Sequence, residues 1–167
     1  IFGASLMIPK QIGFALFPKS EKPMFRVTFE TPEGSSLNET NRVARLVENE
    51  LKQVPEVKYF STSVGRGNPR MYYNVIERSE ASNYAEVFVQ LQDEIHPPQK
   101  EKIIDKLREK LRYIPNANVE VVDFEQGPNT EAPIAIRVLG DDLEQLRTVA
   151  ADVEKILKDT QGTIYVK

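Results

Sequence analysis

The order of apolar and polar residues along this chain repeats a strand–helix–strand pattern. The first copy has a strand at 24–30, a helix that Pro55 ends, and a strand at 57–60. The second has a strand at 85–89, a helix that ends before Pro115, and a strand at 119–122. Apolar residues alternate with polar ones in the first strand, and they recur three and four positions apart in the helices. These periods predict two βαβ units of the same kind.

Each predicted helix has one apolar stripe, opposite a face rich in Lys and Glu. Ser36 and Glu39 form a capping-box pattern that starts the first helix. The second helix is predicted from about Pro98 to Ile114, and the third begins at Asp141 and ends near Gly162. Since a helix must bury its apolar face, we assign the stripes to the core. They consist of Val43, Leu46, Val47, Leu51 and Val54, then Ile103, Ile104, Leu107, Leu111 and Ile114, then Leu143, Leu146, Val149, Val153, Ile156 and Leu157.

The predicted fold class is α+β. Over residues 20–127, two βαβ units interleave into a ferredoxin-like split βαβ sandwich, βαββαβ, with an antiparallel sheet and both helices on one face. The other sheet face would be uncovered, and such a face either binds a ligand or packs against a neighbouring domain. It would present Arg26, Thr28, Glu30, Lys58, Phe60, Glu86, Phe88 and Gln90.

A third βαβ pattern, from Ile134 to Val166, has no unit after it. We interpret residues 128–167 as the leading, incomplete half of a second similar subdomain. A lone unit cannot cover its own sheet, so we expect the sequence to be a piece of a larger protein. By itself, the chain should self-associate through this half or be poorly ordered there.

Residues 1–19 differ from the rest because they are mostly apolar, broken by Pro9-Lys10-Gln11. Neither apolar run reaches the ~20 residues that cross a bilayer. Two interpretations stay open: a buried N-terminal helix, or the end of a membrane helix that begins upstream. Gly3, Pro9 and Gly13 favour the second, since membrane helices tolerate these residues better.

Composition excludes several kinds of site. The net charge of −3 argues against a nucleic-acid surface, which needs a basic face. No cysteine is present, which excludes disulfides, thiolate metal sites and a cysteine nucleophile. The only histidine, His96, precedes two prolines in a predicted exposed turn and has no partners for a zinc site or a triad. We expect no catalytic residue, no metal site and no cofactor.

An irregular segment at 63–76 separates the two complete units. Gly65 and Gly67 permit a positive φ, and Asn68-Pro69 favours a turn. Residues 71–76 are predicted to form a strand, whereas a phosphate-cradling loop would lead into a helix. The segment is therefore either a plain connection or a mobile loop that faces a ligand.

Four sequence blocks point to a known family. They are Pro-Glu-Gly-Ser-Ser-Leu at 32–37, Val-Gly-Arg-Gly-Asn at 64–68, the block at 82–91 and the block at 132–140. With them, nearly the whole chain resembles the second large periplasmic loop of resistance-nodulation-division (RND) efflux transporters. The resemblance implies that residues 20–127 are the first C-terminal porter subdomain and that residues 128–167 begin the second.

The resemblance also implies a biological setting. The full protein would be a homotrimeric, proton-driven multidrug pump of the acriflavin-resistance type, in the inner membrane. Its partners would be small-molecule substrates, a periplasmic adaptor and an outer-membrane channel, and this segment would lie in the periplasm.

Site residues follow from the same resemblance. Substrate would enter a cleft between the two subdomains, next to a glycine-rich loop. The cleft walls would be Arg26, Thr28 and Glu30 on one side and Pro133, Ala135 and Arg137 on the other. The loop would be Gly65, Arg66, Gly67, Asn68, Pro69, Arg70 and Met71. Several pumps of this family line the cleft with Phe and Met, so the polar residues here suggest a more polar or charged cargo.

Two other functions stay open. A free-standing ferredoxin-like small-ligand or acyl-phosphatase-type domain needs an anion-binding loop at a helix start; Arg66 and Asn68 are present, but no helix is predicted there. An RNA-binding sheet would use Tyr72, Tyr73 and Phe88 as stacking platforms, which the weakly acidic charge disfavours.

Overall fold

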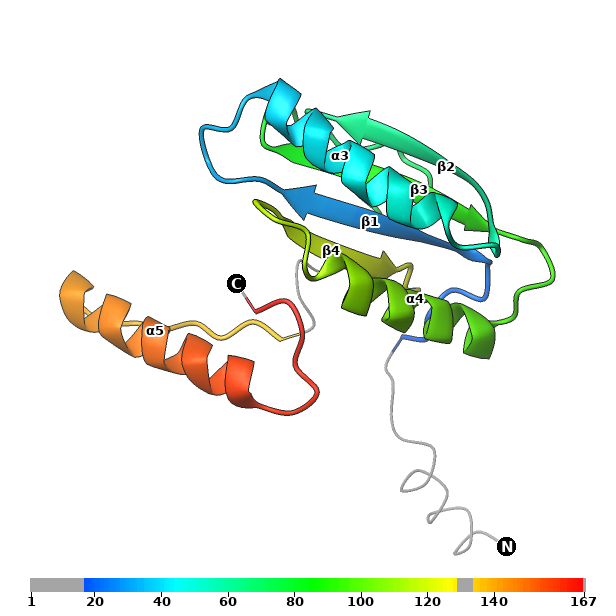
Figure 1. Ribbon diagram of the computed structural model, residues 1–167. Helices are drawn as coiled ribbons and strands as arrows, with labels where there is room; N and C mark the ends of the chain where they lie inside the picture. The colour runs from blue at the N-terminus through cyan, green and yellow to red at the C-terminus, as the bar shows by residue number, and fades with distance from the viewer. Residues whose placement is uncertain (1–16, 129–133, 167) are drawn as a thin grey trace, which may run out of the picture. The chain divides into compact units, whose positions relative to one another are not determined.

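The computed structural model describes residues 17–128 and 134–166, which fall into two units (Figure 1). The first unit extends to Asn129 and the second begins at Thr130. The elements of the first unit are β1 (Met24–Glu30), α3 (Leu37–Lys52), β2 (Val57–Val64), β3 (Tyr84–Leu91), α4 (Pro97–Leu111) and β4 (Asn118–Asp123). The second unit contains α5 (Leu143–Asp159).

The first unit has the predicted ferredoxin-like topology. Its sheet has four strands in the order β2-β3-β1-β4. β1 lies at the centre, antiparallel to β3 on one side and to β4 on the other, and β3 is antiparallel to β2. The interleaved βαββαβ arrangement is therefore confirmed.

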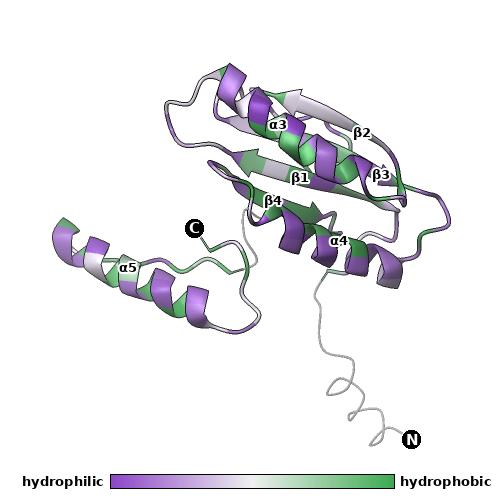
Figure 2. Cartoon of the chain, in the orientation of Figure 1, coloured by the Kyte–Doolittle hydropathy of each residue, from purple (hydrophilic) through white to green (hydrophobic). Residues whose placement is uncertain are grey.

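The core lies between the sheet and the two helices of the first unit. Figure 1 shows α3 and α4 side by side on one face of the sheet, and Figure 2 shows apolar residues along both helices. Phe25 and Val27 are 0% exposed, as are Val47 and Leu51 on α3. Burying one such side chain stabilises the fold by roughly 1.5–3 kcal/mol. The apolar stripes predicted for these two helices thus meet the apolar face of the sheet.

The start of α3 shows the Ser36 half of the predicted capping box, while the Glu39 carboxylate binds Arg42. Ser36 is the N-cap of α3, and its hydroxyl accepts a hydrogen bond from the Glu39 backbone N–H at 3.3 Å. His96 is exposed at the N-cap of α4, directly before Pro97, and its own N–H donates to Gln99 Oε1 at 3.4 Å. The capping satisfies backbone groups that a helix end leaves without intrahelical partners.

One residue of β2 was assigned to the wrong sheet face. Phe60 pairs with Val89 and packs against the core, and does not face away from the helices. The reason is a register shift between Val57 and Tyr59, which turns the following residues over. Tyr59 stands opposite Gln90 and is 56% exposed.

The sheet face away from the helices is covered in part, which the sequence interpretation did not predict. Residues 65–83, between β2 and β3, fold back over it, and Tyr72 packs there with Met24, Phe88 and Phe124. The strand predicted at 71–76 does not form: Val75 N–H donates to Tyr72 O at 3.2 Å in a turn. The buried Tyr72 side chain and this turn take the place of the strand pairing that was expected at 71–76.

The chain enters and leaves the sheet of the first unit along neighbouring segments. Ser20 N–H donates to Phe124 O at 2.6 Å, and Gln126 N–H donates to Pro18 O at 2.9 Å. The Lys100 side chain, 1% exposed, reaches this place from α4. Its ammonium donates to Asp123 Oδ1 at 2.8 Å and also to the carbonyl of Ser20.

The second unit has a helix without a packed partner. In its described residues, α5 buries no side chain, and no strand forms at 134–142 or 160–166. The two strands expected to flank α5 are therefore not confirmed. A strand needs a neighbouring strand for its backbone hydrogen bonds, and none is present in the described part of this unit.

The expectation for residues 1–19 concerns mostly residues outside the described ranges. Of these, 17–19 are described, and Lys19 forms an isolated β-bridge with Glu125. Within 17–128 and 134–166, none of the helices combines the length and the hydropathy of a membrane span.

Candidate functional site

The predicted cleft residues of the first unit lie on the sheet face away from the helices. Because side chains of a strand alternate, Arg26, Thr28 and Glu30 share one side of β1 while Phe25, Val27 and Phe29 fill the core. All three polar residues are partly exposed. The register places Arg26 between Phe88 of β3 and Val122 of β4.

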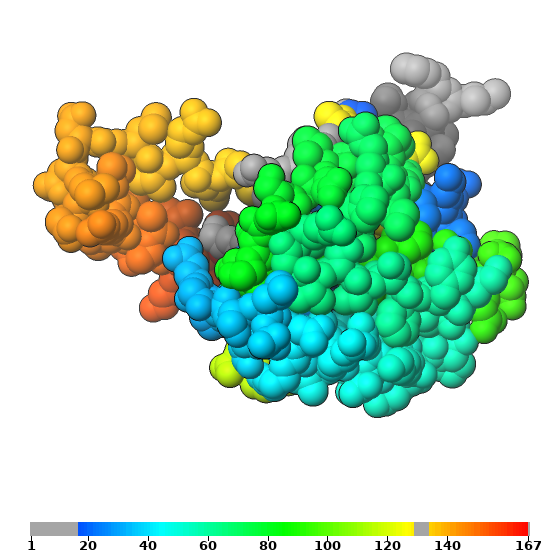
Figure 3. All heavy atoms as spheres, turned by 90° about the horizontal axis from the view of Figure 1, so that it is seen from above, coloured from blue at the N-terminus to red at the C-terminus, as the bar shows by residue number. Residues whose placement is uncertain are grey.

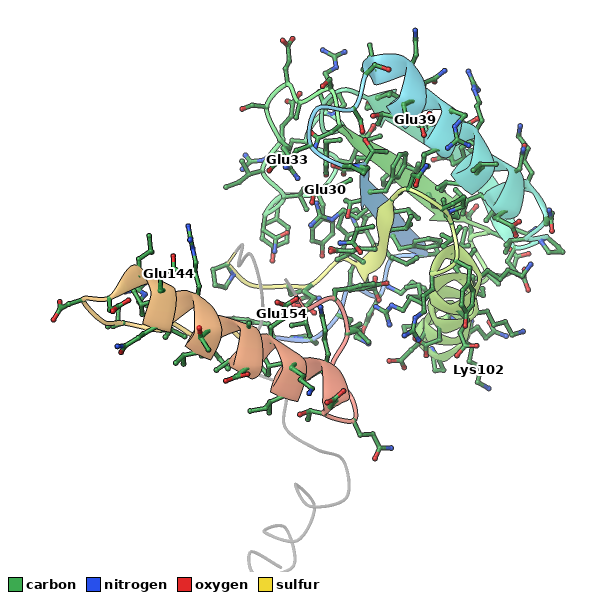
Figure 4. The ribbon with its side chains drawn as sticks, turned by 60° about the vertical axis from the view of Figure 1, so that its left-hand side comes forward. Glu30, Glu33, Glu39, Lys102, Glu144 and Glu154 are labelled. Atoms are coloured by element: carbon green, nitrogen blue, oxygen red, sulfur yellow. The ribbon has the colours of Figure 1, made fainter. Side chains whose placement is uncertain are left out.

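A cluster of charged and aromatic side chains lies at the Glu30 end of this face. Arg78, from the segment between β2 and β3, forms an ion pair with Glu30. Its guanidinium also lies over the Tyr84 ring, 4.3 Å from the centroid. Figure 4 labels Glu30 beside the side chains of this segment. An exposed ion pair contributes at most about 1 kcal/mol. The contact of the Arg78 guanidinium with the Tyr84 ring therefore also helps to hold Arg78 in place.

Tyr84 and Glu86 form the buried part of this cluster, each 5% exposed. The Tyr84 hydroxyl donates to Glu86 Oε2 at 3.1 Å. Burial, and then the Glu86 carboxylate, raise the pKa of Tyr84, so its hydroxyl stays protonated as a donor. Nearby, the buried Nε of Arg26 has no hydrogen-bond partner among the described residues.

The glycine-rich loop is attached to the sheet at its start. Gly65 has a φ of 83°, and its N–H donates to Tyr84 O at 2.8 Å. Asn68 is 4% exposed; it accepts from Ser63 Oγ at 2.7 Å and donates to Glu86 O at 3.2 Å. A Cβ on Gly67 would lie 2.7 Å from Arg78 N, so only glycine fits this close approach.

The other loop residues form an exposed arm, which we define as Arg66, Pro69, Arg70, Met71, Tyr73 and Ile76. Met71 is 46% exposed, Tyr73 60% and Ile76 68%. Arg66, Pro69 and Arg70 are exposed as well. Figure 3 shows the segment after β2, in green, on the side of the sheet away from α3. The arm offers two cations and three apolar groups to solvent from a fixed base.

The predicted second wall of the cleft belongs to the second unit. Ala135 and Arg137 are both exposed, and Pro133 lies outside the described residues. The cleft between the two walls therefore stays a prediction, whereas Arg26, Thr28, Glu30 and the loop base share one face of the first unit.

Comparison with known proteins decides the family. The sequence model of the AcrB/AcrD/AcrF family matches residues 1–167. The chain belongs to this family of RND efflux transporters. The resemblance read from the sequence blocks is thereby confirmed.

Two solved structures show the same fold. One crystal form of a heavy metal efflux pump is 17% identical with a TM-score of 0.59, over 98% of this chain and 18% of the pump chain. A second crystal form is 19% identical with a TM-score of 0.66, over 93% of this chain and 17% of that one. The chain thus spans less than a fifth of the pump chains that it resembles. No curated protein matched it significantly.

Several residues that shape this face of the RND segment were missed from the sequence. Arg78 pairs with Glu30 and lies over the Tyr84 ring, and Asn74 donates to Gly127 O; these contacts hold the 65–83 segment. Their signal was weak, since one Arg and one Asn in a polar stretch resemble ordinary loop residues. Tyr72 was noted only as a possible stacking platform for RNA, yet it is 8% exposed and packs against Phe124.

The loop geometry bears on the enzymatic alternative. An acyl-phosphatase-type site would hold an anion at a helix N-terminus. No helix starts within residues 65–83, and the side chain of Asn68 is committed to Ser63 and Glu86. In the described ranges, no cluster of three or more His, Asp or Glu side chains is arranged to hold a metal ion.

Proposed function

We propose that this chain is a periplasmic porter segment of a proton-driven RND multidrug efflux pump. Residues 20–127 form the first C-terminal porter subdomain, and residues 128–167 begin the second. The segment carries one wall of the cleft that admits substrate, together with its glycine-rich loop. It has no enzymatic role and needs no cofactor. The family match supports the pump, and the loop geometry supports the role within it.

The loop assignment rests on one observation: the glycine-rich loop has a base that is attached to the sheet and an arm that is exposed. Gly65 and Asn68 bind β3, and the Gly67 N–H donates to Arg78 O within the same segment. Arg66, Arg70 and Met71 are therefore exposed on a base that is attached to the sheet. Fixed presentation lowers the entropy cost of contacting a ligand. Cations beside apolar groups suit molecules that combine an apolar body with acidic or polar groups.

Family membership supports the wider setting that we propose. The full protein is a homotrimer in the inner membrane, works with a periplasmic adaptor and an outer-membrane channel, and carries this segment in the periplasm. The two similar solved structures are heavy metal pumps, but identities of 17% and 19% indicate a shared fold and do not identify a cargo. We propose small organic molecules, with metal salts as the discriminating comparison.

Tolerance of cells to toxic compounds tests the loop assignment. In the full-length transporter, Arg66→Ala with Arg70→Ala should change the tolerance to acidic and polar compounds by several-fold, and Arg112→Ala should not. Arg112 is an exposed arginine at the end of α4, outside this face. Unchanged tolerance at normal expression would remove the arm from the mechanism. A change confined to metal salts would replace the organic cargo with metal ions.

A further inference from the structure

The segment that leaves the first unit is held from two sides. Residues 124–127 follow β4 and precede the second unit. On one side, Phe124 O and Gln126 N–H bind the incoming segment at Ser20 and Pro18. Successive backbone groups of an extended chain point in alternate directions, so the remaining groups of 124–127 face another partner.

That partner is the turn at residues 72–75, in the middle of the 65–83 segment. Asn74 Nδ2 donates to Gly127 O at 2.7 Å and to Glu125 O at 2.9 Å. In return, Gly127 N–H donates to the Tyr73 hydroxyl at 2.8 Å. One asparagine and one tyrosine thus satisfy three backbone groups of the outgoing segment.

Ring stacking fastens the same two segments. The Tyr72 and Phe124 rings stack with centroids 4.8 Å apart at 24°. Gly127 has a φ of 121°, and a Cβ there would lie 2.4 Å from the Phe17 ring. The path of the outgoing chain is therefore closely specified between Phe17 and the 72–75 turn.

We propose that residues 72–75 clamp the outgoing segment 124–127, so that the exposed arm and the path of the chain toward the second unit move as one. Asn74 is a positioning residue in this device. The role rests on the proposed function, since cargo that displaces the arm would then also shift the start of the second subdomain. Coupling of this kind is reciprocal: a change at either end must appear at the other.

Residue-resolved hydrogen exchange of the whole 167-residue chain tests the clamp. In Asn74→Ala, the Gly127 amide should exchange about 3- to 10-fold faster, the range expected when a hydrogen-bonded contact is lost. The decisive variant is Gly67→Ala, which disturbs the loop base where Gly67 approaches Arg78 and makes no contact with 124–127. The clamp predicts faster exchange of Gly127 in this variant too.

Two control variants separate a specific effect on Gly127 from a general loss of stability. Asn68→Ala loosens the loop base through other contacts and serves if Gly67→Ala does not fold. Asn49→Ala, on the exposed side of α3, should leave Gly127 unchanged. If a base variant speeds exchange in the loop while Gly127 keeps its wild-type rate, the clamp is refuted. This readout does not involve transport, so a failure of the tolerance assay alone would remove the arm from the transport mechanism and leave the clamp standing.

Discussion

Helices α3 and α5 have similar local chemistry and differ in what covers them. Each begins at a side-chain N-cap: Ser36 binds one backbone N–H, and Asp142 binds the N–H groups of Glu144 and Gln145. Each carries an apolar stripe. Yet α3 buries Val43, Val47 and Leu51 with three other residues, whereas α5 buries none in the described unit. Caps and periodicity thus specify a helix, but its stability depends on the surface against which it packs.

The exposed stripe of α5 leaves apolar side chains in contact with water, whereas the helices of the first unit bury theirs. Leu143 is 62% exposed and Ile156 64%, and Leu139 before the helix is 81% exposed. Apolar surface of this extent marks an interface with something else. The comparison therefore contrasts a unit with a packed core and a unit whose described helix leaves its apolar stripe exposed.

The largest expected effect comes from the buried ion pair of the first unit. Lys100→Met should lower the free energy of unfolding by about 3–5 kcal/mol, because it leaves Asp123 charged and buried without its partner. Burial raises the pKa of Asp123, and the Lys100 ammonium opposes that shift. Urea unfolding followed by circular dichroism measures the loss. The double variant Lys100→Met with Asp123→Leu should recover part of it; no recovery would contradict the pairing.

A matched pair of leucines tests the comparison itself. Leu51→Ala on α3 removes a side chain that is 0% exposed and should cost about 2–5 kcal/mol, since it opens a cavity in the core. Leu143→Ala on α5 removes one that is 62% exposed and should change stability by no more than about 0.5 kcal/mol. Equal losses in urea unfolding would show that α5 is packed in solution.

Loss of the Tyr84 hydroxyl should have a smaller effect on the free energy of unfolding, and that effect should depend on pH. Tyr84→Phe removes the donor to buried Glu86 and should cost about 1–2 kcal/mol at neutral pH. The pKa of Tyr84 is raised in the folded state, so its stabilising contribution is complete below the unfolded pKa near ~10 and is lost as the pH rises further. The difference in urea midpoint between wild type and Tyr84→Phe should therefore narrow above that pH. A constant difference would contradict the raised pKa.

The elements of the first unit were predictable from the sequence because their signals are local. The alternation around Phe25, Val27 and Phe29 gave β1, and Ser36 with Glu39 gave the start of α3. The errors concern pairing over long distances. The register shift that turns Phe60 inward depends on how β2 meets β3, which no local period encodes.

The candidate site was predictable only in outline. The positions of Arg26, Thr28 and Glu30 on one face follow from strand alternation. The cover over that face depends on Tyr72, Asn74 and Arg78, whose partners lie far away in the sequence. The prediction of two strands that flank α5 failed for a related reason. The strand patterns at 134–140 and 164–166 have no neighbouring strand in the described part of the second unit.

Hydrogen exchange in α5, compared with α3, tests the central claim most directly. In the isolated chain, the amides of Val47 and Leu51 should be protected to nearly the full stability of the first unit, and those of Val149 and Val153 should exchange almost as in a free helix. Dilution should distinguish self-association through α5, which would add protection only at high concentration. Protection of α5 equal to that of α3 in a monomeric sample would contradict the account of an apolar stripe on α5 that nothing covers in this chain.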